Sequence, residues 1–185
     1  RLLRIHAPLI GLGENFSIYD MDDSRKLLKS VLEEEKLEST HASPDAIAHA
    51  ISTAKNNLVT PDKYRETALY GNALSGLVER AYPAYQRALL RANAVDFDDL
   101  LQHVAVLLRE NPETRKQQDA RYKYILVDEY QDTNLAQYAI IRALSIDYPN
   151  LSVTGDPDQS IYGWRGANVR NILEFERDFP NVKVV

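Results

Sequence analysis

Two adjacent carboxylates, Asp128 and Glu129, directly follow the short apolar run Tyr124–Val127. A run of this composition predicts a buried parallel strand, and the ligands of parallel sheets bind at the carboxyl ends of the strands. Neighbouring residues at a strand end point in different directions, so one carboxylate can bind Mg²⁺ while the other faces an attacking water. The pair therefore has the composition and position that hydrolysis of a nucleoside triphosphate requires.

Other interpretations of Val127-Asp128-Glu129 stay open at this point. The two carboxylates could simply end a strand and begin a turn. An aspartate at a strand end could also accept a phosphoryl group. The choice between these interpretations depends on the next motif along the chain.

The second motif is the loop Gly155–Gly166, which follows a second predicted strand at 151–154. If both strands belong to one parallel sheet, this loop lies beside the acidic turn. The side-chain amide of Gln159 can donate a hydrogen bond to a terminal phosphate oxygen without adding charge. We therefore expect Gln159 to sense whether ATP or ADP is bound.

Three side chains of the same loop could bind a nucleic acid: Tyr162, Trp164 and Arg165. Trp164 is the only tryptophan of the chain, and stacking of such a side chain on a base contributes about 1–3 kcal/mol regardless of sequence. The alternative is that Trp164 seals the loop against the sheet. In that case Arg165 would pair internally with Asp156 or Asp158. If the first interpretation holds, a few residues connect the phosphate sensor to the base-stacking side chain, so hydrolysis could change the grip on a nucleic acid directly.

The first two thirds of the chain predict helices. Capping side chains followed by helix-type apolar spacing occur at four places: Asp23 or Ser24, Ser43, Thr60 and Asp96. The helix that begins after Thr60 would run to about Arg91. We expect a break or kink where Gly71, Gly76 and Pro83 interrupt it.

The pattern changes after about Lys123. Runs rich in β-branched residues at 124–127, 151–154 and 182–185 alternate with two helices. Thr133 or Asn134 caps the first of these helices and Asn168 caps the second. The order strand-helix-strand-helix-strand predicts a parallel α/β sheet.

The composition excludes several classes of protein. The 185 residues contain no cysteine, so disulfides and thiolate metal sites are excluded, and a reducing cytoplasm is the expected location. No apolar run approaches the roughly 20 residues that cross a bilayer, so no membrane association is expected. The four histidines lack the spacing of metal ligands. The net charge of -5 argues against a whole-surface DNA binder but allows a local patch.

Both motifs resemble segments of one protein family. Ile125–Asn134, with the sequence ILVDEYQDTN, resembles motif II of the UvrD/Rep-type superfamily 1 DNA helicases. Gly155–Ala167, with the sequence GDPDQSIYGWRGA, matches their motif III almost residue for residue. Val95–Leu101 and Arg1–Arg4 are also similar to this family, so the resemblance extends over essentially the whole chain.

The resemblance implies an α/β fold in two parts. Residues 1–123 would form a mainly helical subdomain of the type called 1B. Residues 124–185 would form part of a RecA-like core domain, 1A, with the parallel sheet of the P-loop NTPases. A Walker A loop is absent from these residues, as are the motifs of a second RecA-like domain. We therefore expect a fragment that depends on the remaining helicase domains and is inactive alone.

The implied function is that of an ATP-dependent helicase that moves 3′ to 5′ on single-stranded DNA, binds single-strand–duplex junctions and unwinds duplexes, with ATP and Mg²⁺ as cofactors. By this resemblance Asp128 binds Mg²⁺, Glu129 is the catalytic base and Gln159 contacts the γ-phosphate. Gln131 and Asp132 match positions that couple the nucleotide site to its surroundings. The residues implied to lie on the DNA path are Tyr162, Trp164 and Arg165.

Two alternatives to a stand-alone helicase remain. The chain could belong to the motor subunit of a helicase-nuclease, which carries the same motifs. It could also be a non-catalytic DNA-binding module on a helicase scaffold. The presence of Asp128, Glu129 and Gln159 favours an enzyme, because binding alone would not require them.

Overall fold

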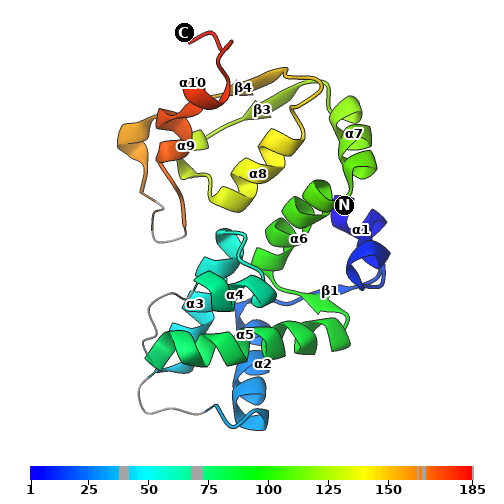
Figure 1. Ribbon diagram of the computed structural model, residues 1–185, viewed down its shortest axis with the longest axis vertical. Helices are drawn as coiled ribbons and strands as arrows, with labels where there is room; N and C mark the ends of the chain where they lie inside the picture. The colour runs from blue at the N-terminus through cyan, green and yellow to red at the C-terminus, as the bar shows by residue number, and fades with distance from the viewer. Residues whose placement is uncertain (38–41, 68–72, 162, 164–165, 185) are drawn as a thin grey trace. The chain divides into compact units, whose positions relative to one another are not determined.

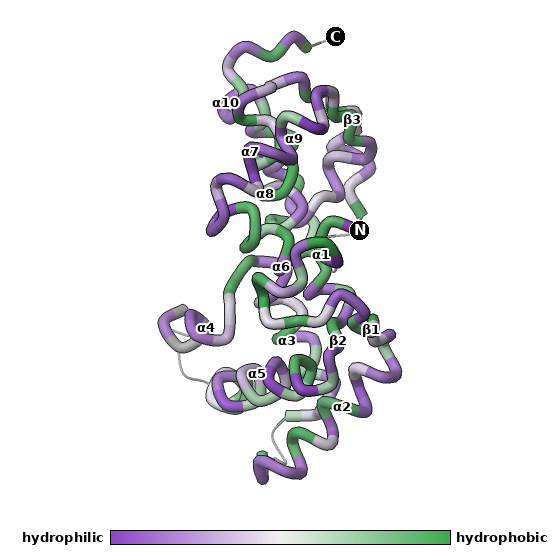
Figure 2. The backbone as a smooth tube through the Cα atoms, turned by 90° about the vertical axis from the view of Figure 1, so that its right-hand side faces the viewer, coloured by the Kyte–Doolittle hydropathy of each residue, from purple (hydrophilic) through white to green (hydrophobic). Residues whose placement is uncertain are grey.

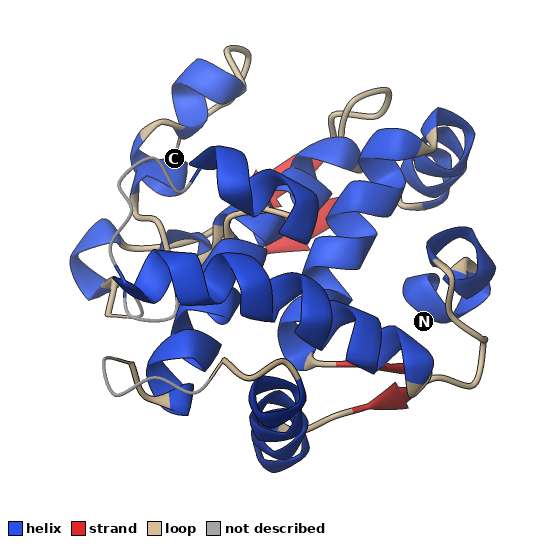
Figure 3. Cartoon of the chain, turned by 60° about the horizontal axis from the view of Figure 1, so that its bottom comes forward, coloured by secondary structure: helices blue, strands red, loops and turns tan. Residues whose placement is uncertain are grey.

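The computed structural model describes residues 1–37, 42–67, 73–161, 163 and 166–184. The chain divides into two compact units, residues 1–107 and residues 108–185. Most described residues are helical, and the strands form two small parallel sheets of two strands each (Figure 1, and the arrows in Figure 3). This arrangement confirms the α/β class. Among the described helices, none is long and apolar enough to cross a membrane.

The first unit is built mainly from helices. Its helical elements are α1 (Leu2–Ile5), the 3₁₀ helix η1 (Ala7–Ile10), α2 (Met21–Glu34), α3 (Pro44–Asn56), α4 (Pro61–Thr67), α5 (Ala73–Arg91) and the start of α6 (Phe97–Glu110). A short parallel pair joins β1 (Ser17–Ile18) to β2 (Ala94–Val95). The sequence pattern did not predict this pair, because two residues per strand are too few to show a period.

Capping side chains set the helix starts. Oγ of Ser43 accepts a hydrogen bond from the Ala46 N–H at 3.2 Å, which confirms the predicted start of α3. Asp96 also caps as predicted, since its Oδ1 accepts from the Asp99 N–H at 2.8 Å. The expected start of α2 at Asp23 or Ser24 was wrong. Asp20 is the cap, because its carboxylate accepts from two backbone N–H groups of the first turn, each at 2.9 Å.

A break or kink was expected at Gly76 and Pro83, but the helix α5 continues through both residues without a break. Proline removes one backbone donor from a helix, and packing of the same helix can offset that loss. Val78 and Tyr82, which lie between these two residues in α5, are fully buried. Gly71 lies outside the described residues.

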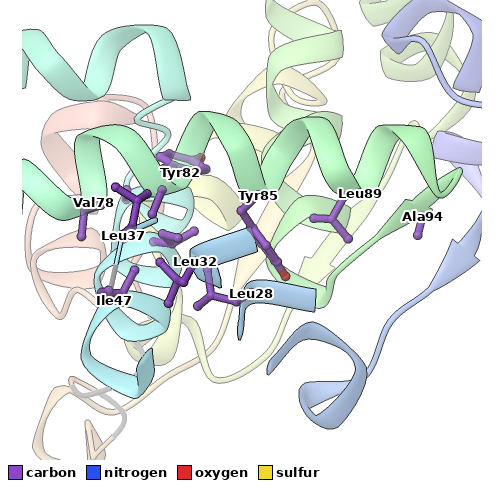
Figure 4. Close-up of a cluster of buried hydrophobic side chains, with 12 residues drawn as sticks. Leu28, Leu32, Leu37, Ile47, Val78, Tyr82, Tyr85, Leu89 and Ala94 are labelled. Carbon is purple, nitrogen blue, oxygen red and sulfur yellow. The ribbon is translucent and has the colours of Figure 1, made fainter. Parts of the chain in front are cut away.

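The core of the first unit lies where α5 crosses α2 and α3, as Figure 4 shows. Figure 2 shows hydrophilic and hydrophobic residues alternating along α2, as expected for a helix with one buried face. Each large apolar side chain that is fully buried contributes about 1.5–3 kcal/mol. The buried residues of this core are Leu28, Leu32, Leu37, Ile47, Ile51, Ala54, Val78, Ala81, Tyr82, Tyr85, Leu89 and Ala94.

A buried cation lies beside this core. Nζ of Lys55, on α3, is 2.6 Å from Oδ2 of Asp96 and 2.7 Å from Oδ1 of Asp99, and the lysine side chain is fully buried. The hydroxyl of Tyr85 donates to the same oxygen of Asp96 at 3.1 Å. These contacts bind α3 and α5 to the first turn of α6.

The second unit carries both sequence motifs. Its elements are α7 (Pro112–Arg121), β3 (Ile125–Val127), the 3₁₀ helix η2 (Tyr130–Asp132), α8 (Leu135–Ala143), β4 (Leu151–Val153), the 3₁₀ helix η3 (Pro157–Gln159), α9 (Arg170–Leu173) and α10 (Phe175–Asp178). The two predicted strands are confirmed as a parallel pair, with Ile125 opposite Leu151 and Val127 opposite Val153. Asn134 caps α8 as predicted, in a reciprocal capping box with Gln137.

Some expectations for the second unit were wrong. The expected strand at 182–185 does not form over 182–184, because the Val182 N–H bonds to the carbonyl of Phe179 in a turn. The helix expected after Asn168 is divided into α9 and α10. The strand β3 is not buried on both faces: Leu126 is 74% exposed, while its neighbours Ile125 and Val127 are partly buried.

The compact units divide between Leu107 and Leu108, whereas the subdomains implied by the resemblance divide at 123/124. The helix α7 belongs to the second unit because Asp119 is tied to the segment before β4. Its Oδ2 accepts from the N–H groups of Ile146 and Asp147 at 3.1 and 2.7 Å. Arg115 adds ion pairs to both Asp119 and Asp147, at 3.0 and 2.8 Å.

Candidate active site

The two motifs meet at one edge of the β3–β4 sheet. Because the strands are parallel and adjacent, Asp128 and Gly155 emerge at the same end (Figure 1). The pairing continues beyond the strands: the Thr154 N–H donates to the Val127 carbonyl at 2.8 Å, and the Tyr130 N–H donates to the Thr154 carbonyl at 2.9 Å. The expectation that the second loop begins beside the acidic turn is confirmed.

Asp128 is exposed at the end of β3, and only one of its two carboxylate oxygens accepts hydrogen bonds from the described residues. Oδ1 accepts from the Thr154 hydroxyl at 2.5 Å and from the Glu129 N–H at 3.0 Å. The hydrogen bond from Thr154, with a smaller effect of the Glu129 N–H, lowers the pKa of Asp128. The carboxylate is therefore ionised at neutral pH.

These contacts fit a divalent cation. Both hydrogen bonds that the described residues make to the Asp128 carboxylate end on Oδ1, which leaves Oδ2 for a metal. Mg²⁺ in nucleotide sites uses one or two protein carboxylates and takes its remaining ligands from water and phosphate oxygens. The Asp128 carboxylate has the chemistry of one such ligand.

Glu129 has a backbone conformation that side-chain-bearing residues seldom adopt. Its φ is 52° and its ψ is 43°, in the left-handed region, at the start of the 3₁₀ helix η2. This conformation costs about 1–2 kcal/mol in a residue with a Cβ atom. The chain turns sharply after β3, so the backbone orients the Asp128 and Glu129 side chains differently. Strain of this kind is concentrated at functional sites.

Gln131 connects Glu129 to the second motif. Its side chain is 1% exposed, and Nε2 donates to Oε2 of Glu129 at 2.7 Å. At the other end of the amide, Oε1 accepts from the Asp156 N–H at 3.1 Å. The close approach depends on glycine at position 155, where a Cβ atom would lie 2.4 Å from Oε1 of Gln131. One buried amide therefore links the proposed base to the start of the second loop.

Gln159 lies on the exposed side of the same network. Its Nε2 donates to Oδ2 of Asp156 at 2.7 Å. The other carboxylate oxygen of Asp156 accepts from the Asp158 N–H at 3.0 Å and caps η3. A continuous path of contacts thus runs from Glu129 through Gln131 and Asp156 to Gln159.

Asp132, the other expected coupling residue, follows Gln131 in η2. Its Oδ1 is buried and has no hydrogen-bond partner among the described residues. A buried carboxylate oxygen without a donor is costly.

A second link between the motifs was not expected from the sequence. Nδ2 of Asn171, on α9, donates to the carbonyl and to Oγ1 of Thr133, each at 3.0 Å. The Asn168 N–H donates to the same carbonyl at 3.0 Å. The Tyr130 ring packs edge-on against Phe175, with ring centroids 5.3 Å apart. The acidic turn is therefore fixed to the segment that follows the second loop.

Three expected DNA-binding residues, Tyr162, Trp164 and Arg165, lie outside the described residues. The neighbouring Gly166 has a φ of 80°, and its N–H donates to the Gly163 carbonyl at 3.0 Å. This positive φ lies in the left-handed region, which glycine adopts without strain.

Sequence reasoning missed Thr154 and Asn171. The position of Thr154, last in an apolar run and directly before the glycine of the loop, could have indicated a hydroxyl at the same sheet edge as Asp128. Asn171 gave no comparable signal, because its partner Thr133 is distant in the sequence and only the fold brings the two together.

Comparisons with known proteins identify the family of the chain. The family model of the UvrD/REP helicase N-terminal domain matches residues 1–180. Proteins named ATP-dependent DNA helicase PcrA from Staphylococcus epidermidis (strain RP62A), Leuconostoc citreum and Staphylococcus aureus (strain Mu50) are each 44% identical to the chain, and the matches cover 100% of it. The chain spans only about a quarter of their length, from 24 to 25%. The chain belongs to the UvrD/REP helicase family and corresponds to the N-terminal domain of that family.

Proposed function

We propose that the full-length protein containing this chain is an ATP-dependent DNA helicase that moves 3′ to 5′ along single-stranded DNA and unwinds duplexes. The observation that carries the proposal is the path of contacts from Glu129 through Gln131 and Asp156 to Gln159. It joins a hydrolytic carboxylate to a potential phosphate sensor at one sheet edge. The names of the relatives support the same activity.

The proposed roles follow from which oxygens are free. Asp128 would hold Mg²⁺ through Oδ2, since Oδ1 is occupied by Thr154 and the Glu129 N–H. The cation would offset negative charge on the phosphates. Glu129 would orient the attacking water and accept its proton through Oε1, because Oε2 accepts from Gln131.

Gln159 would gain a second partner when ATP binds. In this structure its Nε2 donates to Asp156. The amide nitrogen carries two N–H groups, so the second would donate to the γ-phosphate. Because Asp156 also bonds to Gln131, a movement of Gln159 toward the phosphate would be transmitted to Glu129. Gln131 and Asp132 would thus couple the nucleotide state to the second loop.

The DNA side of the motor is proposed from the resemblance of the second loop. Tyr162, Trp164 and Arg165 would bind single-stranded DNA, and the helical part of the chain, residues 1–123, would act as the 1B subdomain at the single-strand–duplex junction. Residues 124–185 would belong to core domain 1A. The remaining helicase domains would complete the nucleotide site.

The hydrolytic role is tested by Glu129→Gln in the full-length protein. We expect ATP turnover to fall by at least about a hundredfold while binding of a fluorescent ATP analogue is retained. Glu176→Gln is the matched control, because Glu176 is exposed on α10. Turnover by Glu129→Gln at the rate of the control would exclude Glu129 as the base.

The DNA role is tested by the fluorescence of Trp164. If the full-length protein contains other tryptophans, the Trp164 signal is obtained by comparing the unchanged protein with Trp164→Phe. Oligothymidine should quench the Trp164 fluorescence, and more strongly at low salt.

The direction of movement is measured with partial duplexes that carry either a 3′ or a 5′ single-stranded tail. Unwinding from a 5′ tail alone would contradict the proposed polarity.

A further inference from the structure

We propose that Thr154 is a positioning residue that holds the Asp128 carboxylate in the orientation required for the divalent cation. The inference rests on the proposed function, in which Asp128 binds that cation.

Thr154 is bonded to the acidic turn by three separate groups. Its N–H donates to the Val127 carbonyl, and its carbonyl accepts from the Tyr130 N–H, at 2.8 and 2.9 Å. Its hydroxyl donates to Oδ1 of Asp128 at 2.5 Å. The two backbone bonds flank Asp128 and Glu129 in the sequence, so the backbone of Thr154 is fixed relative to both carboxylate residues.

The hydroxyl selects one orientation of a carboxylate that is otherwise free to rotate. Asp128 is exposed, so packing contributes little to the choice of its rotamer. The branched side chain of threonine restricts its own χ1, and the donor is therefore held in place. Two donors, from Thr154 and from the Glu129 N–H, converge on Oδ1 and leave Oδ2 without a hydrogen bond from the described residues.

This arrangement has the chemistry of an outer-shell partner of a metal ligand. Residues that hydrogen-bond to a metal-binding carboxylate fix its orientation, and their loss weakens metal binding about 10–100-fold. A backbone role alone would not require a hydroxyl, because valine has the same shape and the same β-strand preference. The hydroxyl of Thr154 is thus the group to test.

The test compares Thr154→Val with Thr154→Ser in the full-length protein. Binding of the fluorescent nucleotide mant-ADP is titrated at several MgCl₂ concentrations and in EDTA. We expect Thr154→Val to need about 10–100-fold more Mg²⁺ for the same gain in nucleotide affinity, with unchanged affinity in EDTA. Thr154→Ser, which keeps the hydroxyl, should respond to Mg²⁺ within about threefold of the original protein.

Asp128→Asn separates this inference from the proposed function. If Asp128→Asn loses the Mg²⁺ response and Thr154→Val keeps it, Thr154 has no positioning role and the inference is overturned. If Asp128→Asn itself keeps the response, Asp128 is not the metal ligand and the proposed function fails at that residue. Equal losses in EDTA for both Thr154 variants would show a role in folding of the sheet edge, which also overturns the inference.

Discussion

Gln131 donates a hydrogen bond from Nε2 to Oε2 of Glu129 over 2.7 Å, from a side chain that is 1% exposed. Glu129 itself is exposed, so its carboxylate is held from the inside of the fold while its other oxygen remains available. The same amide accepts from the Asp156 N–H at its other end. One side chain therefore connects the start of the second loop to the Glu129 carboxylate.

Gln131→Leu should lower kcat for ATP hydrolysis in the full-length protein by at least about tenfold, with little change in KM for ATP. Leucine retains the volume but removes the donor to Glu129 and the acceptor for the Asp156 N–H. The unpaired N–H should also reduce the free energy of unfolding by about 1–3 kcal/mol. Steady-state kinetics and urea unfolding measure these effects, and Gln117→Leu, on the exposed side of α7, is the control. An unchanged kcat would show that Gln131 does not position the base.

Gly155→Ala should disrupt the same link by steric contact. The new Cβ atom would lie 2.4 Å from Oε1 of Gln131 and 2.9 Å from Cδ1 of Ile172, so the loop or the amide must shift. We expect a loss of about 1–3 kcal/mol in unfolding free energy and a lower kcat. Gly76→Ala is the matched control: it meets open space within α5 and should stabilise the protein by up to about 1 kcal/mol. Thermal unfolding of both variants measures the contrast, and equal stabilities would contradict it.

Local signals made β3, β4 and three of the helix caps predictable. Ser43, Asp96 and Asn134 each cap through a bond to a backbone group three residues away, so the sequence contains both partners. The position of Asp128 and Glu129 was predictable for the same reason, because a short apolar run and its end are adjacent in the chain. The pairing of β3 with β4 followed from the rule that parallel strands alternate with helices.

Features that depend on distant partners were not predictable. The Thr154–Asp128 and Asn171–Thr133 contacts join residues far apart in the sequence, and only the packed fold reveals them. The strand expected at 182–185 had the right composition, but 182–184 do not pair as a strand. Composition gives these residues a preference for the strand conformation. A strand also needs a neighbouring strand to complete its backbone hydrogen bonds.

Lys55→Met should strongly destabilise the chain. It removes the cation that lies 2.6 and 2.7 Å from Asp96 and Asp99. The two buried carboxylates then lose the positive charge of the lysine and gain little solvation in its place. Breaking a buried ion pair at one partner costs about 3–5 kcal/mol. Urea unfolding at pH 7 measures the loss, and Lys29→Met, on the exposed surface of α2, is the control. A loss below about 1 kcal/mol would show that methionine packing replaces the ion pair.

The unfolding free energy should fall as the pH rises above about 10, and Tyr82→Phe should reduce that dependence. Burial is the main cause that raises the pKa of Tyr82 to about 12. Its hydroxyl oxygen lies 3.1 Å from the Val59 carbonyl and 3.3 Å from Oε1 of Gln102, and its one proton is shared between these two acceptors. In the unfolded chain a tyrosine loses its proton near pH 10, whereas the folded protein keeps that proton up to about pH 12. Between these values the unfolded state binds fewer protons, so each pH unit lowers stability by about 1.4 kcal/mol.

Lys55 changes stability with the same sign. The two aspartates raise its pKa against the opposing effect of burial, so the folded protein keeps the lysine proton after the unfolded chain has lost it above about pH 10.4. Tyr82→Phe removes only the tyrosine contribution. Between pH 10 and 11.5, we therefore expect the unfolding free energy of Tyr82→Phe to fall with pH less steeply than that of the original protein, but still to fall. Urea unfolding followed by circular dichroism at each pH gives this slope, with Tyr124→Phe at an exposed position as the control. If Tyr82→Phe has the same slope as that control, ionisation of Tyr82 does not contribute to alkaline unfolding.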